Sequence, residues 1–335
     1  MGVSIVVGGQ FGSEGKGKVA RWFAEKNQVS TAVRVGGINS GHTVIDAEGH
    51  AVIFRILPTA AIDRRVTCVL PAGSYLDVEL LFHEIKKAEI SPSKVKIHPR
   101  AVIITEREIE LERKMGLSER LGSTGSGTGA AVGLRAMRDP KLTFAKDIGE
   151  LKSFLCDTGE LLQEEVVRGH EVLIEGTQGF GLSCLHSPYY PKATSRDTSA
   201  AGFLSEAGLS PFDVEHIVMV IRSYPIRVHG KESGTLPNET TWEEVTSAAK
   251  RQAPIREYTS VTNKLRRVGQ FDPDIVLRAI AANRPDQIVL NHMDYIPGEP
   301  GSFGAERAAF VEQVQRQLNQ KIDYVGLDPI TVYPV

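Results

Sequence analysis

The sequence predicts an α/β fold with a large central, mostly parallel sheet flanked by helices. Short apolar, β-branched runs are typical of strands buried on both faces, and they lie at residues 3–7, 31–35, 66–70, 171–174, 216–221 and 287–290. Amphipathic segments between and after these runs predict helices at residues 17–26, 77–88, 106–115, 148–167, 273–283 and 305–319. The chain has 32 glycines, concentrated in four loops, where glycine lets the backbone approach a ligand closely.

The composition is that of a folded globular chain. Its 335 residues are 41% hydrophobic and 24% charged, which rules out disorder and allows a sizeable core. There is no repeat and no Pro/Ser/Gly-rich linker, so residues 1–335 are expected to form one elaborated domain. The 39 Lys and Arg residues balance 41 Asp and Glu residues, which argues against a nucleic-acid partner bound along its phosphate backbone.

Cysteine content and the N-terminus predict the compartment. Cys68, Cys156 and Cys184 are far apart and odd in number, which disfavours a disulfide framework or a four-ligand zinc site, so we expect reduced, structural cysteines. The first residues fit neither a signal peptide nor a myristoylation pattern. Because the apolar stretches are far shorter than a membrane span, we expect no membrane partner and a cytoplasmic protein.

The first glycine-rich loop predicts a phosphate site between a strand and a helix. Residues 6–19 read V-V-G-G-Q-F-G-S-E-G-K-G-K-V, and residues 12–18 have the spacing G-x-x-x-x-G-K of a phosphate loop. In such a loop backbone N–H groups, a helix N-terminus and lysine hold phosphate. Val19 stands where a standard loop has Ser or Thr for magnesium, so this loop is of another type. The alternative is a tight turn with two solvated lysines.

Two further loops suit phosphate groups. Residues 34–43, R-V-G-G-I-N-S-G-H-T, follow a strand and place His42 among glycines. A lone histidine is more often structural, but in this setting it becomes a candidate donor to phosphate. Residues 121–130, L-G-S-T-G-S-G-T-G-A, alternate glycine with hydroxyls and precede Arg135 and Arg138. They suit a nucleoside monophosphate, with a flexible linker as the alternative.

The remaining candidate segments lie in the second half of the chain. E-G-T-Q-G-F-G-L at 175–182 leaves a strand, and with Tyr190–Ala200 it offers Gln178 and Thr194 for neutral hydrogen bonds to a base and a phosphate. S-V-T-N-K-L-R-R-V-G-Q-F-D at 260–272 is a basic loop suited to a dicarboxylate or a triphosphate, or simply solvated. N-H-M-D at 291–294 ends a strand with a carboxylate that could accept from a purine.

Taken together, and in this order, five motifs resemble the adenylosuccinate synthetase family over nearly the whole chain: G-S-E-G-K-G-K, G-G-I-N-S-G-H-T, G-S-T-G-S-G-T-G, E-G-T-Q-G-F-G and V-T-N-K-L-R-R-V-G. The resemblance implies the family's open central sheet, related to P-loop folds, together with a homodimer, Mg²⁺ and a nucleoside triphosphate. The family reaction phosphorylates O6 of a hypoxanthine nucleotide and then replaces that phosphate with the amine of L-aspartate. The short chain is similar to the archaeal branch.

One departure from the family lies in the first loop. The family motif is G-D-E-G-K-G-K, whose Asp removes the purine N1 proton and contacts magnesium; here the residue is Ser13. General-base catalysis is worth about 10²- to 10⁴-fold, so the chain has either lost activity or changed substrate. It resembles the phage branch of the family, which makes the precursor of 2-aminoadenine DNA from dGMP and has Ser for Asp. A short hydroxyl accommodates the guanine amino group better than a carboxylate does.

Two more departures concern the sugar and the phosphate donor. The family segment V-T-G-R-R-R-R has a first arginine that reaches the ribose, and the matching residues here are Asn263 and Lys264. A 2′-deoxy sugar needs less at such a bidentate site. The family T-K-L-D, which reads the guanine of GTP, is N-H-M-D here, and the chain ends in T-V-Y-P at 331–334. We therefore expect ATP as donor, with GTP still open.

The resemblance implies a ligase that joins L-aspartate to C6 of dGMP in the cytoplasm, which is the host cytoplasm if the chain is phage-encoded. Ser13 and His42 would be catalytic, and Ser13 and the Gly41 carbonyl would contact Mg²⁺. The expected triphosphate site is Gly12, Ser13, Gly15, Lys16, Gly17, Lys18, Gly41, His42, Thr43, Arg266, Asn291, Asp294, Thr331 and Pro334. The expected dGMP site is Ser13, Asn39, Ser123, Thr124, Arg138, Gln178, Thr194 and Lys264, with Arg138 from either subunit. The expected aspartate site is Thr262, Asn263, Lys264, Leu265, Arg266 and Arg267.

Two other functions stay open at this point. The first is an ordinary adenylosuccinate synthetase that uses IMP and GTP despite the substituted base. The second is a catalytically silent nucleotide-binding regulator, which the loss of the general base would permit. A regulator would not need His42 or an intact basic loop, and the sequence keeps both.

Overall fold

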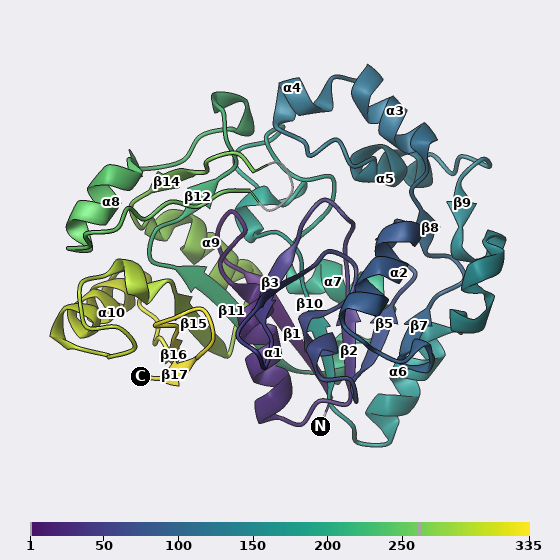
Figure 1. Cartoon of the computed structure of the whole chain (residues 1–335), viewed down its shortest axis with the longest axis horizontal. Helices are drawn as coiled ribbons and strands as arrows, with labels where there is room; N and C mark the ends of the chain where they lie inside the picture. The colour runs from purple at the N-terminus through teal and green to yellow at the C-terminus, as the bar shows by residue number, and fades with distance from the viewer. Residues whose placement is uncertain (1, 260–262) are drawn as a thin grey trace.

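A large twisted sheet forms the centre of the molecule (Figure 1). The computed structural model describes residues 2–259 and 263–335, and within them nine strands pair in the order β17-β16-β15-β11-β1-β10-β2-β5-β7. Every pair is parallel except β16 with β17, which confirms the expected α/β class. The strands are β1 (Val3–Gly8), β2 (Thr31–Arg34), β5 (Thr67–Leu70), β7 (Val95–Ile97), β10 (Val172–Glu175), β11 (Val214–Arg222), β15 (Gln287–Asn291), β16 (Tyr324–Val325) and β17 (Tyr333–Pro334).

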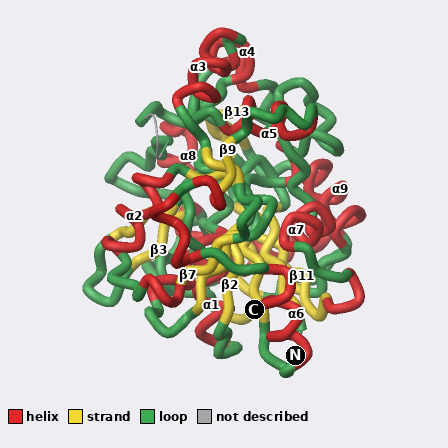
Figure 2. The backbone as a smooth tube through the Cα atoms, turned by 90° about the vertical axis from the view of Figure 1, so that its right-hand side faces the viewer, coloured by secondary structure: helices red, strands yellow, loops and turns green. Residues whose placement is uncertain are grey.

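Helices cover both faces of this sheet, which explains why its central strands are apolar on both sides. The helices are α1 (Lys16–Lys26), α2 (Val78–Lys87), α3 (Glu106–Lys114), α4 (Leu117–Leu121), α5 (Thr128–Ala136), α6 (Thr158–Val167), α7 (Ala200–Ala207), α8 (Trp242–Ala248), α9 (Pro273–Asn283) and α10 (Ala305–Leu318). Val6 of β1 packs with Phe23 of α1, whereas Ile5 faces the core that contains Phe203 of α7 and Val276 of α9. Figure 2 shows α7 and α9 together on one side of the strands.

Smaller sheets carry the loops that extend from the central sheet. One hairpin joins β3 (His42–Ile45) and β4 (Ala51–Phe54); a second group is β6 (Tyr75–Leu76), β8 (Val102–Ile103) and β9 (Thr143–Phe144); a third is β12 (Ile226–Arg227), β13 (Glu239–Thr240) and β14 (Arg267–Gly269). The third group packs on α8 through a small core that includes Trp242 and Val268. It forms the upper left of Figure 1, while α3, α4 and α5 form the upper right.

The helix expected at residues 148–167 is wrong in its first half. A 3₁₀ helix covers Gly149–Phe154, and α6 begins only at Thr158. Between them Leu155 forms a parallel bridge with Ile97, and the Cys156 N–H donates to the Ile97 carbonyl at 3.1 Å. Asp157 then caps α6 by accepting from the Gly159 and Glu160 N–H groups. Pairing with the edge strand β7 therefore interrupts the amphipathic pattern.

The topology places the candidate loops together. Strands β1, β2, β10, β11 and β15 are mutually parallel, so their carboxyl ends meet at one edge of the sheet. Strand β1 has neighbours on both sides that come from much later in the chain, and ligands bind at such a switch point in open α/β sheets. A ligand site is therefore expected where β1, β2 and β10 end.

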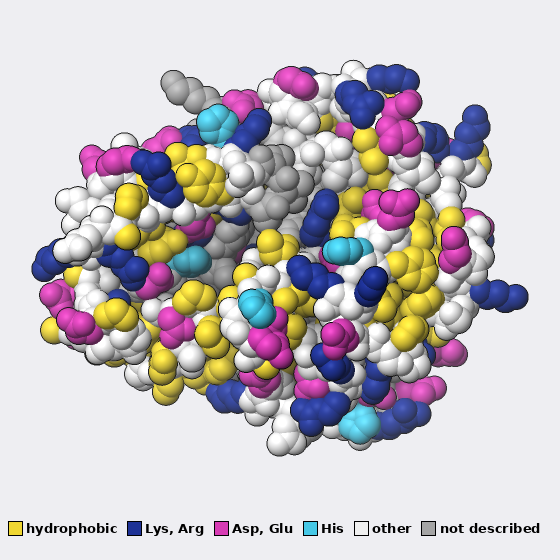
Figure 3. Space-filling view, viewed as in Figure 1, with side chains coloured by type: hydrophobic (Ala, Val, Ile, Leu, Met, Phe, Trp, Pro, Cys, Tyr) yellow, Lys and Arg dark blue, Asp and Glu magenta, His cyan; other side chains and the backbone are white. Residues whose placement is uncertain are grey.

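The surface carries mixed charge. On the face shown in Figure 3, basic and acidic side chains are interspersed around a central hollow. No helix among the described residues is both long enough and apolar enough to cross a membrane. The three cysteines are free, with Cys68 buried and Cys156 and Cys184 partly buried.

Candidate active site

One large cavity, about 860 Å³ in volume, lies at the carboxyl ends of the central strands. All four glycine-rich loops and part of the basic segment line it. The predicted site residues on its wall are Gly12, Ser13, Gly15, Lys16, Gly17, Asn39, Gly41, His42, Thr43, Ser123, Thr124, Gln178, Thr194, Lys264 and Arg266. The predicted residues that do not line it are Lys18, Arg138, Asn263, Leu265, Arg267, Asn291, Asp294, Thr331 and Pro334. Thr262 lies outside the described residues.

The first loop is shaped by an internal carboxylate that the sequence analysis missed. Glu14 is fully buried and accepts from the N–H groups of Gln10 at 3.2 Å and Gly12 at 2.8 Å, and from the Lys16 ammonium at 2.7 Å. Gly15, the N-cap of α1, has φ +89°, a conformation that glycine adopts without strain. Because Glu14 occupies the N–H groups at the start of the loop, the N-terminus of α1 is the part left for an anion.

The two loop lysines lie in different surroundings. The Lys16 ammonium also donates to the Gln178 carbonyl, which ties the first loop to the fourth. The Lys18 ammonium donates to the Asp328 carbonyl at 2.8 Å, near the C-terminus. Burial lowers the pKa of Lys18 to about 8 against the opposing charges of Asp328 and Asp294. Lys16 is thus part of the cavity wall, whereas Lys18 lies behind the loop.

His42 is held by a buried carboxylate at the end of the neighbouring strand β10. Its Nδ1 lies 2.5 Å from Glu175 Oε1, and Glu175 also accepts from Arg34 at 3.0 Å and from the Thr59 N–H and hydroxyl at 2.7 Å each. Burial, then the Arg34 charge, lowers the pKa of His42 to about 3. The ring is therefore neutral at pH 7. With Nδ1–H donated to Glu175, Nε2 is the acceptor of the ring; Arg34 Nη1 lies 3.3 Å from it, and Nε2 is the ring nitrogen that can interact with a ligand.

The third loop is also organised by a carboxylate. Glu112 of α3 is buried and accepts from the Gly127 N–H at 2.9 Å and the Gly129 N–H at 2.6 Å. These groups lie at the N-terminus of α5, so an internal anion takes the place that the sequence analysis offered to phosphate. Ser123 and Thr124 still face the cavity. Arg138, beyond the end of α5, is exposed and does not reach this cavity within one chain.

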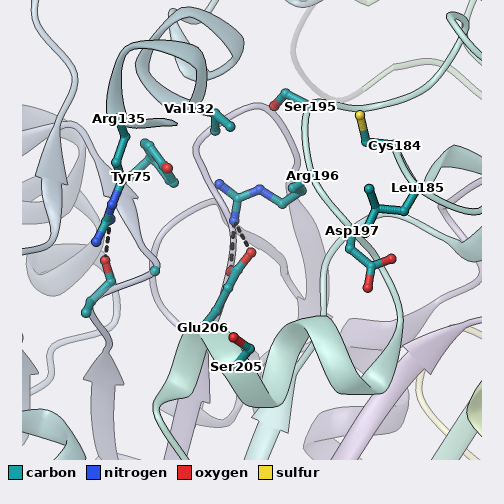
Figure 4. A pocket seen from close by; sticks show the side chains of 12 residues that line it. Tyr75, Val132, Arg135, Cys184, Leu185, Ser195, Arg196, Asp197, Ser205 and Glu206 are labelled. Atoms are coloured by element: carbon teal, nitrogen blue, oxygen red, sulfur yellow. Dashed lines mark hydrogen bonds and ion pairs between the residues drawn. The ribbon is translucent and has the colours of Figure 1, made fainter. Parts of the chain in front are cut away.

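A second cavity of about 490 Å³ adjoins the first, because Cys184 and Ser195 line both (Figure 4). Arg196 crosses it to bind Glu206, with N–O distances of 2.9 and 3.0 Å. On the far side Arg135 donates to the Ala72 carbonyl at 2.6 Å. Arg135, Arg196 and Glu206, which line this second cavity, thus have partners within the protein.

The basic segment divides its side chains between two tasks. Arg267, in β14, donates to Glu239 at 2.7 Å and to the Gly234 carbonyl at 2.6 Å, so it braces the small sheet. Lys264 and Arg266 line the cavity, and Arg266 donates to the Ser13 hydroxyl. The structure thus brings the substituted residue of the first loop into contact with the segment expected to hold aspartate.

The residues expected at the donor base lie beside the C-terminal strands, outside the large cavity. Asn291 is buried and donates to the Glu14 carbonyl at 2.8 Å, so it supports the first loop. Burial raises the pKa of Asp294. The Thr331 N–H donates to the Asp328 carboxylate at 2.7 Å, and the carbonyl of the same Asp328 accepts from Lys18. These residues form a separate corner behind the phosphate loop.

The missed carboxylates each accept backbone or side-chain donors in the loops around the cavity. The donors of Glu14 lie within four residues of it, whereas Gly127 lies 15 residues from Glu112 and Thr59 lies 116 residues from Glu175. No spacing rule identifies them. Glu175 alone gave a signal, since a charged residue ending an apolar strand run is unusual unless it is paired.

An α/β sheet whose glycine-rich loops gather around one cavity at a switch point defines a nucleotide-binding enzyme. The family model described as Adenylosuccinate synthetase matches residues 5–148 and 141–300. The chain is 34% identical to an adenylosuccinate synthetase of Methanococcus aeolicus over 98% of this chain and 97% of the relative, and 35% identical to that of Methanocaldococcus jannaschii over 98% and 92%. The chain therefore belongs to the adenylosuccinate synthetase family, and it is a C–N bond-forming ligase of purine biosynthesis.

Two solved structures share this fold. Succinoaminodeoxyadenylate synthetase of cyanophage S-2L, bound to dGMP and to dATP as an energy donor, has a TM-score of 0.83 at 26% identity and covers 99% of this chain and 95% of its own. Fully ligated adenylosuccinate synthetase of Plasmodium falciparum has a TM-score of 0.83 at 18% identity, covering 98% of each chain. The second likeness concerns the fold alone.

Proposed function

We propose that the chain joins L-aspartate to C6 of dGMP, with an adenine nucleoside triphosphate as phosphate donor. The observation that carries the proposal is Ser13, which faces the cavity at the family's Asp position and binds Arg266 rather than acting as a carboxylate base. A neutral hydroxyl leaves room for the guanine amino group. The likeness to a phage enzyme bound to dGMP and dATP supports both the nucleotide and the donor.

The proposed reaction has two steps. First, O6 of guanine attacks the γ-phosphorus of the triphosphate, an O6–P bond forms as the bond to the nucleoside diphosphate breaks, and the N1 proton passes to solvent water. Second, the neutral aspartate amine attacks C6, the C6–O6 bond breaks, and the proton lost by the amine leaves with the released inorganic phosphate. Positioning and charge neutralisation dominate such phosphoryl transfers. The N-terminus of α1 and Lys16 would face the phosphates.

His42 and Glu175 would act at the transferring phosphoryl group. Neutral His42 needs a proton on Nε2 to donate, and the arrival of an anionic triphosphate raises the pKa of a nearby histidine. Glu175 then stabilises the imidazolium through Nδ1–H. On the basic segment, Lys264 and Arg266 would neutralise the carboxylates of aspartate.

Magnesium fits the oxygen donors that this cavity offers. The Ser13 hydroxyl and the Gly41 carbonyl are hard, neutral ligands, and Mg²⁺ usually takes its remaining ligands from phosphates and water. Bound there, the ion would neutralise charge on the triphosphate. Ser13 in place of Asp lowers the negative charge that the protein itself contributes.

A homodimer would complete the dGMP site. Arg138 lies exposed at the end of α5, away from the cavity of its own chain. An arginine supplied from the partner subunit is consistent with that position.

The test measures phosphate release with L-aspartate and either dGMP or IMP, each with ATP, dATP and GTP. We expect dGMP with an adenine nucleotide to give the highest kcat/KM. The alternative is an ordinary synthetase acting on IMP, which the identity to archaeal synthetases favours. Equal or faster turnover of IMP would establish that alternative, and no turnover of either would favour a regulator.

A further inference from the structure

A buried ion pair connects the first loop with the basic segment. Arg222, the last residue of β11, is fully buried, and its guanidinium binds both carboxylate oxygens of Glu257, with Nη1 3.3 Å from Oε2. The Tyr295 hydroxyl donates to Oε1 of Glu257 at 2.9 Å. Glu257 also lines the large cavity. The three side chains come from three separate parts of the chain.

Both ends of this pair reach Ser13. Arg222 Nη1 donates to the Ser13 carbonyl at 2.8 Å. The backbone N–H of Arg266 donates to the Glu257 carbonyl at 2.8 Å, and the Arg266 side chain donates to the Ser13 hydroxyl. Ser13 has φ +55°, a left-handed conformation that a non-glycine residue keeps only when its surroundings hold it. Arg222 and Arg266, both bonded to Glu257, hold Ser13 in this conformation.

Charge explains why a carboxylate is needed at this point. Arg222 and Arg266 both contact Ser13, so their like charges lie close together. Burial alone would raise the pKa of Glu257, but the charge and hydrogen bond of Arg222 together with the charges of His292 and Arg266 outweigh it, and the pKa falls to about 2. Glu257 therefore stays ionised and offsets the repulsion between the two guanidinium groups.

We propose that Glu257 is a positioning residue that fixes Ser13 of the phosphate loop and Arg266 of the basic segment relative to each other. The proposal rests on the proposed function, in which these two groups meet the purine and the aspartate. Through Arg222, the Glu257 carboxylate sets the backbone of Ser13. The Glu257 backbone carbonyl accepts from the Arg266 N–H, and the charge of the carboxylate attracts the Arg266 guanidinium that binds the Ser13 hydroxyl. Nucleotide recognition and aspartate recognition are thereby coupled through one residue, by one hydrogen-bonded and one electrostatic contact of its carboxylate.

Hydrogen exchange of the unliganded protein tests the coupling without any activity. Glu257→Gln removes the charge and keeps the shape. We expect faster amide exchange in peptides that cover residues 10–16, because Arg222 is then held less firmly against the Ser13 carbonyl, and in those that cover 263–267, because Arg266 loses the attraction of the Glu257 charge. The matched control is Glu206→Gln, which breaks another largely buried Arg–Glu pair, that with Arg196, and should leave residues 10–16 unchanged. Unchanged exchange at 10–16 in Glu257→Gln would overturn the proposal.

Kinetics test whether the carboxylate acts through Ser13. We expect Glu257→Gln to lower kcat/KM about tenfold in the wild-type background. In a Ser13→Ala background the same substitution should lower kcat/KM by a factor at least threefold smaller, since the effects of residues that share a partner are non-additive. A purely structural role would give the same loss in both backgrounds, and that result would contradict the proposal. The cycle is run with whichever of dGMP and IMP is turned over. Failure of dGMP as substrate thus bears on the proposed function alone, and hydrogen exchange decides the coupling if neither nucleotide reacts.

Discussion

The two walls of the cavity hold their key residues in opposite ways. On one wall, His42 sits in a closed buried network, because Glu175 satisfies the ring and is itself fixed by Arg34 and Thr59. On the other, Ser13 is exposed, adopts a left-handed backbone and is held from outside its own loop by Arg222 and Arg266.

Under the proposed function, this difference separates chemistry common to the family, at His42, from substrate choice, at Ser13. A group that handles phosphoryl transfer gains from a rigid, pre-organised environment, because reorganisation during the reaction costs rate. A group that selects the purine is better placed at the exposed rim, where one side chain can change without disturbing a buried network. Changes on the first wall should therefore reduce turnover of every nucleotide, and changes on the second should alter which nucleotide is used.

The largest effect is expected on the first wall. His42→Asn keeps a polar side chain but removes the ring, and we expect kcat to fall by about 10²-fold or more with a smaller change in KM for dGMP. Steady-state kinetics measure both. A change confined to KM would make His42 a binding residue.

The sharpest contrast is expected from Ser13→Asp on the second wall. The carboxylate would meet the guanine amino group and attract Arg266, so kcat/KM for dGMP should fall about tenfold or more, and turnover of IMP should appear or rise. Measuring both nucleotides with the wild type, Ser13→Asp and Ser13→Ala gives the selectivity ratio. An unchanged ratio in Ser13→Asp would show that position 13 does not select the substrate.

Glu175→Gln should cost less than loss of the histidine itself. It weakens a hydrogen bond to a charged group, worth about 1.5–3 kcal/mol, so we expect kcat to fall at least tenfold for dGMP and IMP alike. In a His42→Asn background the same substitution should change kcat little, because its partner is gone. Equal losses in both backgrounds would assign Glu175 to stability rather than to His42.

The smallest effect concerns stability and pH. The pKa of His42 falls from 6.5 to about 3 on folding, so below pH 6.5 the unfolded chain binds a proton that the folded chain does not. Stability is therefore complete above pH 6.5 and declines as the pH falls toward 3, by up to about 1.4 kcal/mol per pH unit for this group. Urea unfolding at pH 7 and pH 5 should show a smaller decline for His42→Asn than for the wild type.

The same contrast explains what the sequence could predict. Strand 3–7, the glycine-rich turn after it and His42 were predictable, because local patterns and spacing determine them. Glu112 and Glu257 were not, because each accepts donors from another segment of the chain. Glu14 was not either, because its donors, although within four residues, reach it only in the folded conformation of the loop. The helix expected at 148–167 failed for a related reason, since pairing of Leu155 with β7 overrides the local periodicity.

The basic segment shows what the spacing of residues in the sequence can and cannot predict. Arg266 and Arg267 are adjacent in sequence and look equivalent there, yet Arg266 faces the cavity and Arg267 is bound to Glu239. Strand β14 begins at Arg267, so Arg266 lies in the loop before the strand and Arg267 in the small sheet. The sequence predicted a cationic segment at the right place but could not say which of its arginines faces the cavity.

The left-handed backbone of Ser13 also bears on how the enzyme could diversify. Besides glycine, that region is best tolerated by Asn and Asp, whose short side chains bond locally, and Ser fits there when held by neighbours. Bulky or β-branched residues are excluded. Position 13 thus accepts few residue types, and these include both the neutral hydroxyl and the carboxylate. Under the proposed function, exchange of this one side chain would shift the preference between the two nucleotides while the phosphate-binding backbone stays unchanged.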